Sequence, residues 1–211
     1  MAYINYLLLD AFRMDNNMAI AKSMNPLNVS LFKGRSEIDL AENAPYIFSY
    51  NPKSEFAEWF MKTGWGKGWG IMLRSHAPVE DLNKHCRSFL IQLDDSKEEI
   101  YFRYYDPLVL SIFLPTCSKE QLKDFFGPID YFIIEDVHNE YGQMFWLEDY
   151  ELKTKRIDKN ELVNRIQNEG ISSVIPNEHA KDTNQINNID IGFNSDVELD
   201  NATKWNKFFF D

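Results

Sequence analysis

Cysteine, basic charge and long apolar runs are all scarce in this sequence of 211 residues. Two cysteines, Cys86 and Cys117, are too few for a disulfide scaffold, so we expect free thiols in a reducing compartment. No apolar run approaches the roughly 20 residues that cross a bilayer, and the run Ile4 to Leu9 lacks the features of a signal peptide. The chain is therefore expected to be cytoplasmic, without membrane insertion.

Basic residues are outnumbered by acidic ones, 22 to 33, which gives a formal net charge of -11. Nucleic-acid binding draws most of its affinity from Lys and Arg that neutralise phosphates, so a nucleic acid is not an expected partner. An anionic membrane surface would be repelled for the same reason. Basic or amphipathic protein partners remain compatible with this charge.

Apolar residues are plentiful, at 44% of the chain, and aromatic residues make up 15%. A chain of this length and composition buries a sizeable core, which excludes wholesale disorder. The composition changes near Pro176. The sequence therefore predicts one domain over 1–176 and an acidic, Asn-rich C-terminal arm over 177–211.

Strand-like and helical patterns alternate over most of Tyr3 to Tyr105, which predicts an α/β fold with helices packed on a sheet. A hairpin joined through 139–142 adds an antiparallel element, so we expect a mixed sheet. Strands are predicted at Tyr3–Ala11, Tyr46–Tyr50, Ile71–Arg74, Glu99–Tyr105, Tyr131–Val137 and Gln143–Leu152, with a short extended piece at Leu31–Gly34. Helices are predicted at Asn16–Met24, Ser36–Ala41, Ser54–Gly64, Pro78–Leu93, Ser118–Gly127 and Asn160–Asn168, with a short helix or turn after Pro107.

No catalytic set of residues is evident, so the chain is not expected to be an enzyme. His85 and Cys86 are adjacent on a predicted helix, where their side chains point about 100° apart and cannot form a dyad. Asp136, His138 and Glu140 would share one face of a strand, but that run leads into a turn where polar residues are expected anyway. We therefore predict neither a metal nor a cofactor.

The Gly-rich loop from Gly64 to Gly70 lacks the pattern of a phosphate-binding loop, and it follows a helix instead of a strand. Its glycines are expected to let Trp65 and Trp69 pack closely at the entry to the next strand. At the end of the arm, Trp205 and Phe209 belong to an aromatic cluster that folds back onto the body or anchors a partner.

The run from Tyr101 to Pro107 is the most unusual part of the sequence. Asp106-Pro107 is a turn signal, because the Asp side chain can bond to the backbone beyond it. If Arg103 and Asp106 are partly buried, they are expected to share hydrogen bonds. Together with Tyr105, these residues form a strand-ending brace or, alternatively, place a functional arginine in a cleft.

A set of short motifs occurs in a fixed order from about Leu7 to Pro128. Its residues are Leu9-Asp10, Ser30-Leu31-Phe32, Gly34, Ala44-Pro45-Tyr46, Trp65, Trp69, Gly70, Ser75, Leu82, His85, Arg87, Phe102 to Pro107, Leu110, Leu114-Pro115, Gln121 and Phe126-Gly127-Pro128. In the order and spacing of these residues the chain resembles the type VI secretion effector chaperones, or adaptors, a family first defined as a domain of unknown function.

The resemblance implies a cytoplasmic protein that binds a toxic effector, keeps it soluble and helps load it on a VgrG-type spike protein, with no cofactor. Exposed aromatic residues and sheet edges are the expected contacts. Two alternatives remain open: an immunity protein that neutralises a toxin, and a small hydrolase that uses Arg103, Asp106 and His85.

Overall fold

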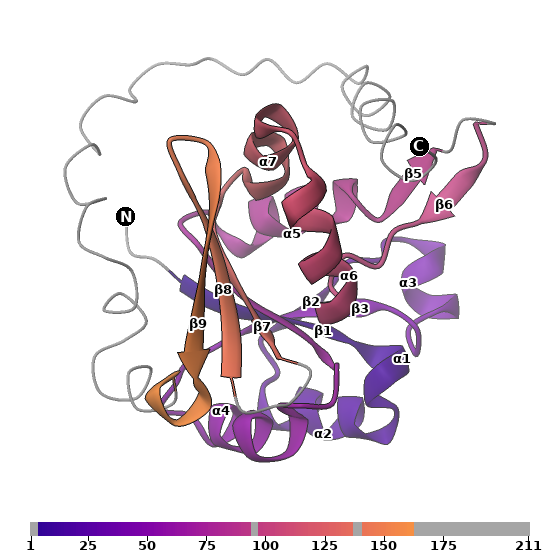
Figure 1. Cartoon of the computed structure of the whole chain (residues 1–211). Helices are drawn as coiled ribbons and strands as arrows, with labels where there is room; N and C mark the ends of the chain where they lie inside the picture. The colour runs from indigo at the N-terminus through magenta and orange to yellow at the C-terminus, as the bar shows by residue number, and fades with distance from the viewer. Residues whose placement is uncertain (1–3, 94–96, 137–140, 163–211) are drawn as a thin grey trace.

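A seven-stranded sheet with helices on both faces organises this computed structural model, which describes residues 4–93, 97–136 and 141–162 (Figure 1). The strand order is β2-β3-β1-β4-β7-β8-β9, and β5 and β6 pair separately. The strands are β1 (Ile4–Asp10), β2 (Asn28–Ser30), β3 (Pro45–Ser49), β4 (Gly70–Ser75), β5 (Ile91–Leu93), β6 (Glu99–Tyr101), β7 (Ile129–Glu135), β8 (Tyr141–Glu148) and β9 (Glu151–Asp158).

The predicted α/β class is confirmed, but the pairing within the sheet differs from the expected mixture. Each pairing between described strands is antiparallel. The reason is the position of β1, which pairs with β3 on one side and with β4 on the other. Because β3 and β4 run in the same direction but are separated by β1, the helical connection between them creates no parallel pair.

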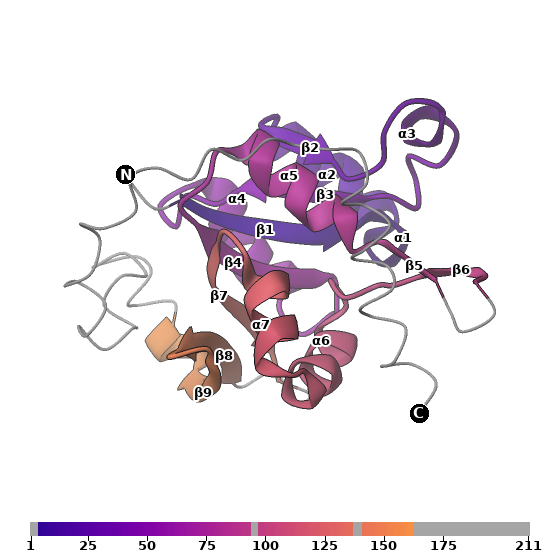
Figure 2. The same cartoon turned by 90° about the horizontal axis from the view of Figure 1, so that it is seen from above.

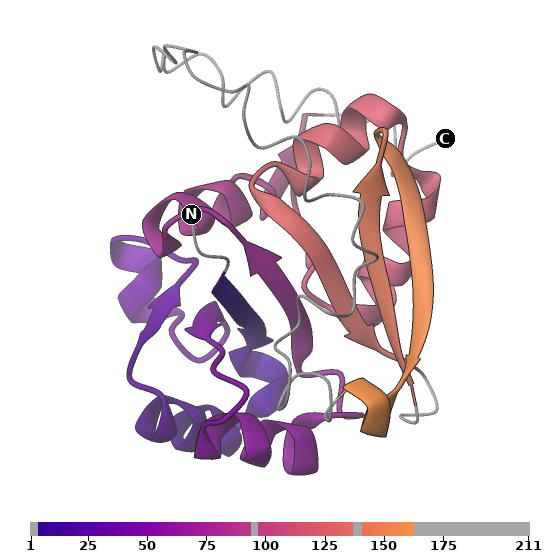
Figure 3. The ribbon, with the colours of Figure 1, turned by 90° about the vertical axis from the view of Figure 1, so that its left-hand side faces the viewer.

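Two hydrophobic cores lie on opposite faces of the sheet. Each is covered by helices, and Figures 2 and 3 show these helices on the two sides of the sheet. Leu7 and Leu9 of β1 face α2 and α4, whereas Tyr6 and Leu8 face α5, α6 and α7. This arrangement explains the uninterrupted apolar run of β1, since a strand covered on both faces does not alternate with polar residues. The helices are α1 (Ala11–Met14), α2 (Asn16–Met24), α3 (Arg35–Asp39), α4 (Glu55–Trp59), α5 (Val79–Ser88), α6 (Pro107–Phe113) and α7 (Lys119–Phe126).

Helices with a strong start signal form where the sequence predicts them. The Ser54 hydroxyl accepts the Ala57 N–H at 3.2 Å, and Ser118 forms a capping box with Gln121. The helix that begins at Ser54 continues beyond Trp59 as a π-helical turn, η1 (Phe60–Gly64), and α6 ends in a 3₁₀ turn, η2 (Leu114–Thr116).

Three boundaries around the ends of the sheets differ from the predictions. The helix expected to reach Leu93 ends at Ser88, because Ile91–Leu93 pairs with Glu99–Tyr101 in a ribbon that projects from the body (Figure 2). The strand expected to reach Tyr105 ends at Tyr101. The second strand of the predicted hairpin ends at Glu148, and β9 follows after a turn at Asp149 and Tyr150, which both have positive φ.

The predicted hairpin itself is confirmed, since β7 and β8 pair from Tyr131 to Glu135. Its loop, at 137–140, lies outside the described residues, as do the predicted boundary at 176, the arm 177–211 and most of the predicted helix Asn160–Asn168. Cys86 and Cys117 are free thiols, as expected. Across the described ranges, no helix is both long enough and apolar enough to span a bilayer.

Candidate functional site

Two aspartates begin two helices at neighbouring places in the fold. Asp10 ends β1 and caps α1, because its Oδ1 accepts the Phe12 N–H at 3.0 Å. Asp106 caps α6 in the same way, with its Oδ1 accepting the Leu108 N–H at 3.0 Å. Pro107 occupies the first turn of α6, where its missing N–H costs nothing. The predicted bond from Asp106 to the backbone beyond it is thus confirmed.

The second oxygen of each aspartate receives an arginine from the other segment. Arg103 donates to Asp10 Oδ2, and Arg13 donates to Asp106 Oδ2, so that each pair joins residues 93 positions apart. We call Asp10, Arg13, Arg103 and Asp106 the clasp. It ties the end of β1 and the start of α1 to the turn before α6.

The expected hydrogen bond between the side chains of Arg103 and Asp106 does not form, because each side chain pairs with a residue of the other segment. Only their backbones meet, through the Asp106 N–H and the Arg103 carbonyl at 3.0 Å. The side chains take partners across the clasp because Asp106 also points at the N-terminus of its own helix. Burial alone would lower the pKa of Arg103, but the hydrogen bond and charge of Asp10 outweigh it and raise that pKa.

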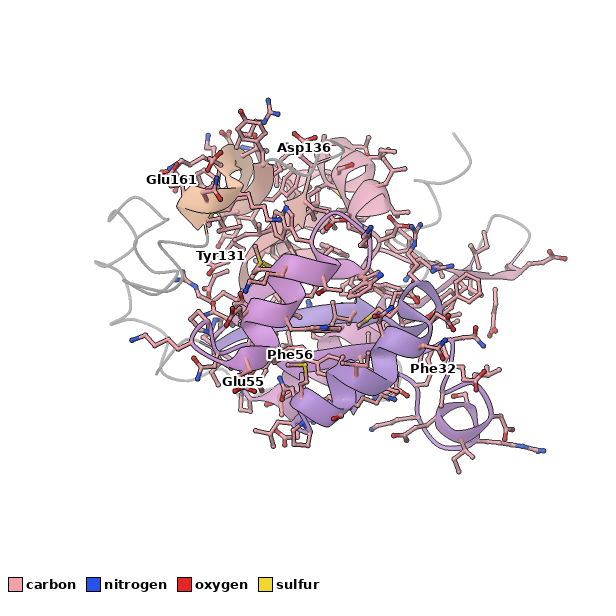
Figure 4. The ribbon with its side chains drawn as sticks, turned by 90° about the horizontal axis from the view of Figure 1, so that it is seen from below. Phe32, Glu55, Phe56, Tyr131, Asp136 and Glu161 are labelled. Atoms are coloured by element: carbon pink, nitrogen blue, oxygen red, sulfur yellow. The ribbon has the colours of Figure 1, made fainter. Side chains whose placement is uncertain are left out.

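A mostly apolar hollow of about 360 Å³ opens beside the clasp. Its wall consists of Phe12, Phe32, Leu40, Asn43, Tyr101, Arg103 and Tyr105. Phe12 is 63% exposed, and the Arg103 guanidinium lies 5.4 Å from the centre of its ring. Phe32 and Tyr101 make an edge-to-face contact at 6.0 Å. In Figure 4, Phe32 lies at the side of the molecule that carries α3, away from Asp136 and Glu161.

Two tyrosine hydroxyls, those of Tyr101 and Tyr105, lie 3.1 Å apart at the hollow. Burial raises the pKa of both phenols above the ordinary value of 10.0. Both hydroxyls therefore stay protonated at neutral pH and remain able to donate a hydrogen bond.

Residues 5–124, more than half of the chain, contain both the clasp and the hollow, and they match DUF4123, a domain of unknown function. The chain belongs to the DUF4123 family. No curated protein and no solved structure matches it. The DUF4123 segment ends within α7, so β7, β8 and β9 follow it in the chain.

Trp65 and Trp69, two of the predicted site residues in the DUF4123 segment, are buried in the core on the α2 and α4 face. The loop that carries them is held by a carboxylate, because the N–H groups of Gly66 and Gly68 both donate to Glu135. Burial raises the pKa of Glu135, against the lowering effect of these two bonds. The backbone donors of this Gly-rich loop thus serve Glu135 within the fold.

His85, the third residue of the hydrolase alternative, has its own partner elsewhere. Its Nε2 lies 2.9 Å from the Phe125 carbonyl, and its ring packs edge-on against Phe89. Arg103 and Asp106 are engaged by Asp10 and Arg13. The three predicted residues thus have separate partners.

The half-buried His85 makes stability depend on pH. Burial lowers the pKa of His85 below the ordinary value of 6.5, against the raising effects of the Phe125 hydrogen bond and the Asp124 charge. The unfolded chain therefore takes up this proton first as the pH falls below 6.5, which lowers the free energy of unfolding by at most about 1.4 kcal/mol per pH unit. His85→Gln, which keeps a donor for Phe125, should flatten this slope in urea unfolding at pH 7.0, 6.0 and 5.5. Equal slopes in both proteins would contradict the assignment.

The remaining predicted residues are divided between the clasp region and the undescribed part of the chain. Tyr105 and Pro107 are buried beside the clasp, whereas Trp205 and Phe209 lie outside the described residues.

Asp136 pairs with Arg156 at 2.9 Å, and the described ranges contain no group of His, Cys, Asp and Glu side chains that could hold a metal. Sequence reasoning missed Phe12, Arg13, Leu40 and Asn43, and it named Asp10 and Phe32 only as part of the family resemblance. A signal for Arg13 was present in the mirrored spacing of Asp10-x-x-Arg13 and Arg103-x-x-Asp106.

Proposed function

We propose that this DUF4123 chain is a cytoplasmic chaperone, or adaptor, that binds a type VI secretion effector and helps load it on a VgrG-type spike protein. The observation that carries the proposal is the open, apolar hollow, whose wall includes the exposed Phe12, Leu40 and Tyr101. The resemblance of the sequence to the effector chaperones supports the identity of the partner.

Exposed apolar side chains around the clasp extend this surface. Phe12 is the second residue of α1 and Leu108 is the second residue of α6, and Leu108 is 60% exposed. Ile112, one turn further along α6, is 62% exposed. Large apolar side chains in water often mark protein-binding surfaces. The clasp holds the starts of both helices in place, so these side chains are presented by a rigid frame.

Capture of the partner from the native cell tests the proposal. The full chain, tagged and expressed at its natural level, should recover an effector and a VgrG-type protein that mass spectrometry identifies. Recovery of neither protein, from cells that are shown to produce both, would refute the adaptor function. Rescue of cells that express the toxin alone would favour the immunity alternative.

Substitution of two exposed wall residues should weaken capture of the effector. We expect the double variant Phe12→Ser and Leu40→Ser to reduce effector affinity at least about 30-fold, because anchor residues of an interface contribute about 2 kcal/mol or more. Titration calorimetry with the captured effector measures the change. Tyr150→Ser, which removes an exposed aromatic at the β8–β9 turn, is the matched control and should bind like the unmodified chain. Equal affinity of the double variant would exclude the hollow as the contact.

A further inference from the structure

The polar groups on the wall of the hollow are the Asn43 amide and the hydroxyls of Tyr101 and Tyr105, which both donate and accept, and the Arg103 guanidinium, which only donates. The Nε–H of Arg103 is buried and has no hydrogen-bond partner within the described ranges. Of the two hydroxyls of Tyr101 and Tyr105, one hydrogen is used between them and the other is left over. An unpaired buried donor is costly, so an occupant that supplies an acceptor would be favoured.

The carboxylates next to the hollow do not supply that acceptor. Asp10 uses one oxygen for the Phe12 N–H and the other for Arg103. Asp106 likewise uses its oxygens for the Leu108 N–H and for Arg13. The clasp therefore fixes the guanidinium of Arg103 at the wall without satisfying its Nε–H.

The size of the hollow limits what can fill it. Pockets for drug-sized ligands and cofactors run from about 300 to 1,000 Å³, and a volume of about 360 Å³ lies at the lower end. Such a volume suits one large side chain and the polar group next to it. The apolar surfaces of Phe12, Phe32 and Leu40 favour an aromatic or long aliphatic side chain.

We propose that the hollow binds a segment of the partner protein in which a large apolar side chain lies beside a carboxylate. The apolar side chain would pack against Phe12, Phe32 and Tyr101, and the carboxylate would accept from Arg103, whose planar guanidinium matches carboxylate geometry. This inference rests on the proposed function, because it names the chemistry of the segment that the adaptor recognises.

The net charge of the chain helps to test the idea. A formal charge of -11 disfavours acidic ligands in general, so a preference for a carboxylate requires a local donor such as Arg103.

Two small probes differ only in this group: N-acetyl-phenylalanine carries a carboxylate, and N-acetyl-phenylalanine amide is neutral. Ligand-observed NMR titrations of the full chain should give millimolar affinity for the carboxylate probe and at least five-fold weaker binding of the amide.

Variants assign the binding to the hollow. Arg103→Lys keeps a positive charge near Asp10 but lacks the Nε–H, so the preference for the carboxylate should fall below two-fold. Phe12→Ser should weaken both probes, since Phe12 is an exposed wall residue. Tyr150→Ser, the control at the β8–β9 turn, should leave both affinities unchanged.

Three results would overturn the inference: equal affinity for the two probes, a preference that survives Arg103→Lys, or a preference that appears only after Phe208, Phe209 and Phe210 are replaced by serine. The last result would show that the chain's own aromatic end occupies the hollow.

Capture of an effector without any preference between the probes would leave the adaptor function standing and refute this inference. A preference without capture would support the ligand chemistry and refute the adaptor function.

Discussion

Replacing Asp10 by alanine should lower the free energy of unfolding by about 3 kcal/mol. Asp10 is only 1% exposed, and it both caps α1 and accepts from Arg103. Loss of the cap accounts for about 1 kcal/mol, and loss of the charge-assisted bond for about 2 kcal/mol. The Arg103 side chain is 35% exposed, so water compensates in part and the loss stays at the lower end of the range for a buried ion pair. Urea unfolding measures the change.

A double-mutant cycle separates the clasp from simple loss of the cap. Asp10→Ala and Arg103→Ala should couple by about 1 to 2 kcal/mol, because each removes the same bond. Asp39→Ala is the matched control, since Asp39 pairs with Arg35 on the surface of α3 and should contribute within about 0.5 kcal/mol. Additive effects of Asp10→Ala and Arg103→Ala would show that the Asp10–Arg103 pair of the clasp does not stabilise the fold.

The clasp shows which part of a site local sequence can predict. Asp106-Pro107 is a turn signal by itself, and the cap it predicts forms. The partners of Arg103 and Asp106 lie 93 residues away, at a place set by the position of β1 in the sheet. No pattern of charges within residues 101–107 indicates that the partners of Arg103 and Asp106 are Asp10 and Arg13. The nearest available pairing, between Arg103 and Asp106, was therefore the wrong one.

The difference between local signals and contacts that are distant in the sequence also explains which elements of the fold were predicted correctly. The helix starts at Ser54 and Ser118 have signals within one turn of chain, and both form as predicted. Strand β5 has three residues and exists because β6 pairs with it, so its sequence looks like the end of the preceding helix. The hollow combines residues from 12 to 105, which only the folded chain brings together.

Gly70 is the position where a single added carbon should do the most damage to this sheet. Gly70 lies opposite Leu9 in the central pair β1–β4. A Cβ there would lie 2.0 Å from the Leu8 carbonyl oxygen and 2.9 Å from the Leu9 Cα. Both atoms belong to the backbone, so neither can rotate away, and the two strands must separate. We expect Gly70→Ala to lower the free energy of unfolding by about 3 kcal/mol or more.

Gly34→Ala is the control for Gly70→Ala, because it isolates the effect of backbone conformation from that of crowding. Gly34 has φ of +63° and ψ of −129°, a backbone conformation that strains any L residue, but no atom lies within 4 Å of an added Cβ, so its substitution should cost about 2 kcal/mol from backbone strain alone. Urea unfolding of both variants measures the difference. A loss at Gly70 no larger than that at Gly34 would mean that β1 and β4 move apart easily. Leu9 precedes Asp10, so separation of β1 from β4 would also displace the clasp. We therefore expect Gly70→Ala to weaken the coupling that the double-mutant cycle of Asp10→Ala and Arg103→Ala measures.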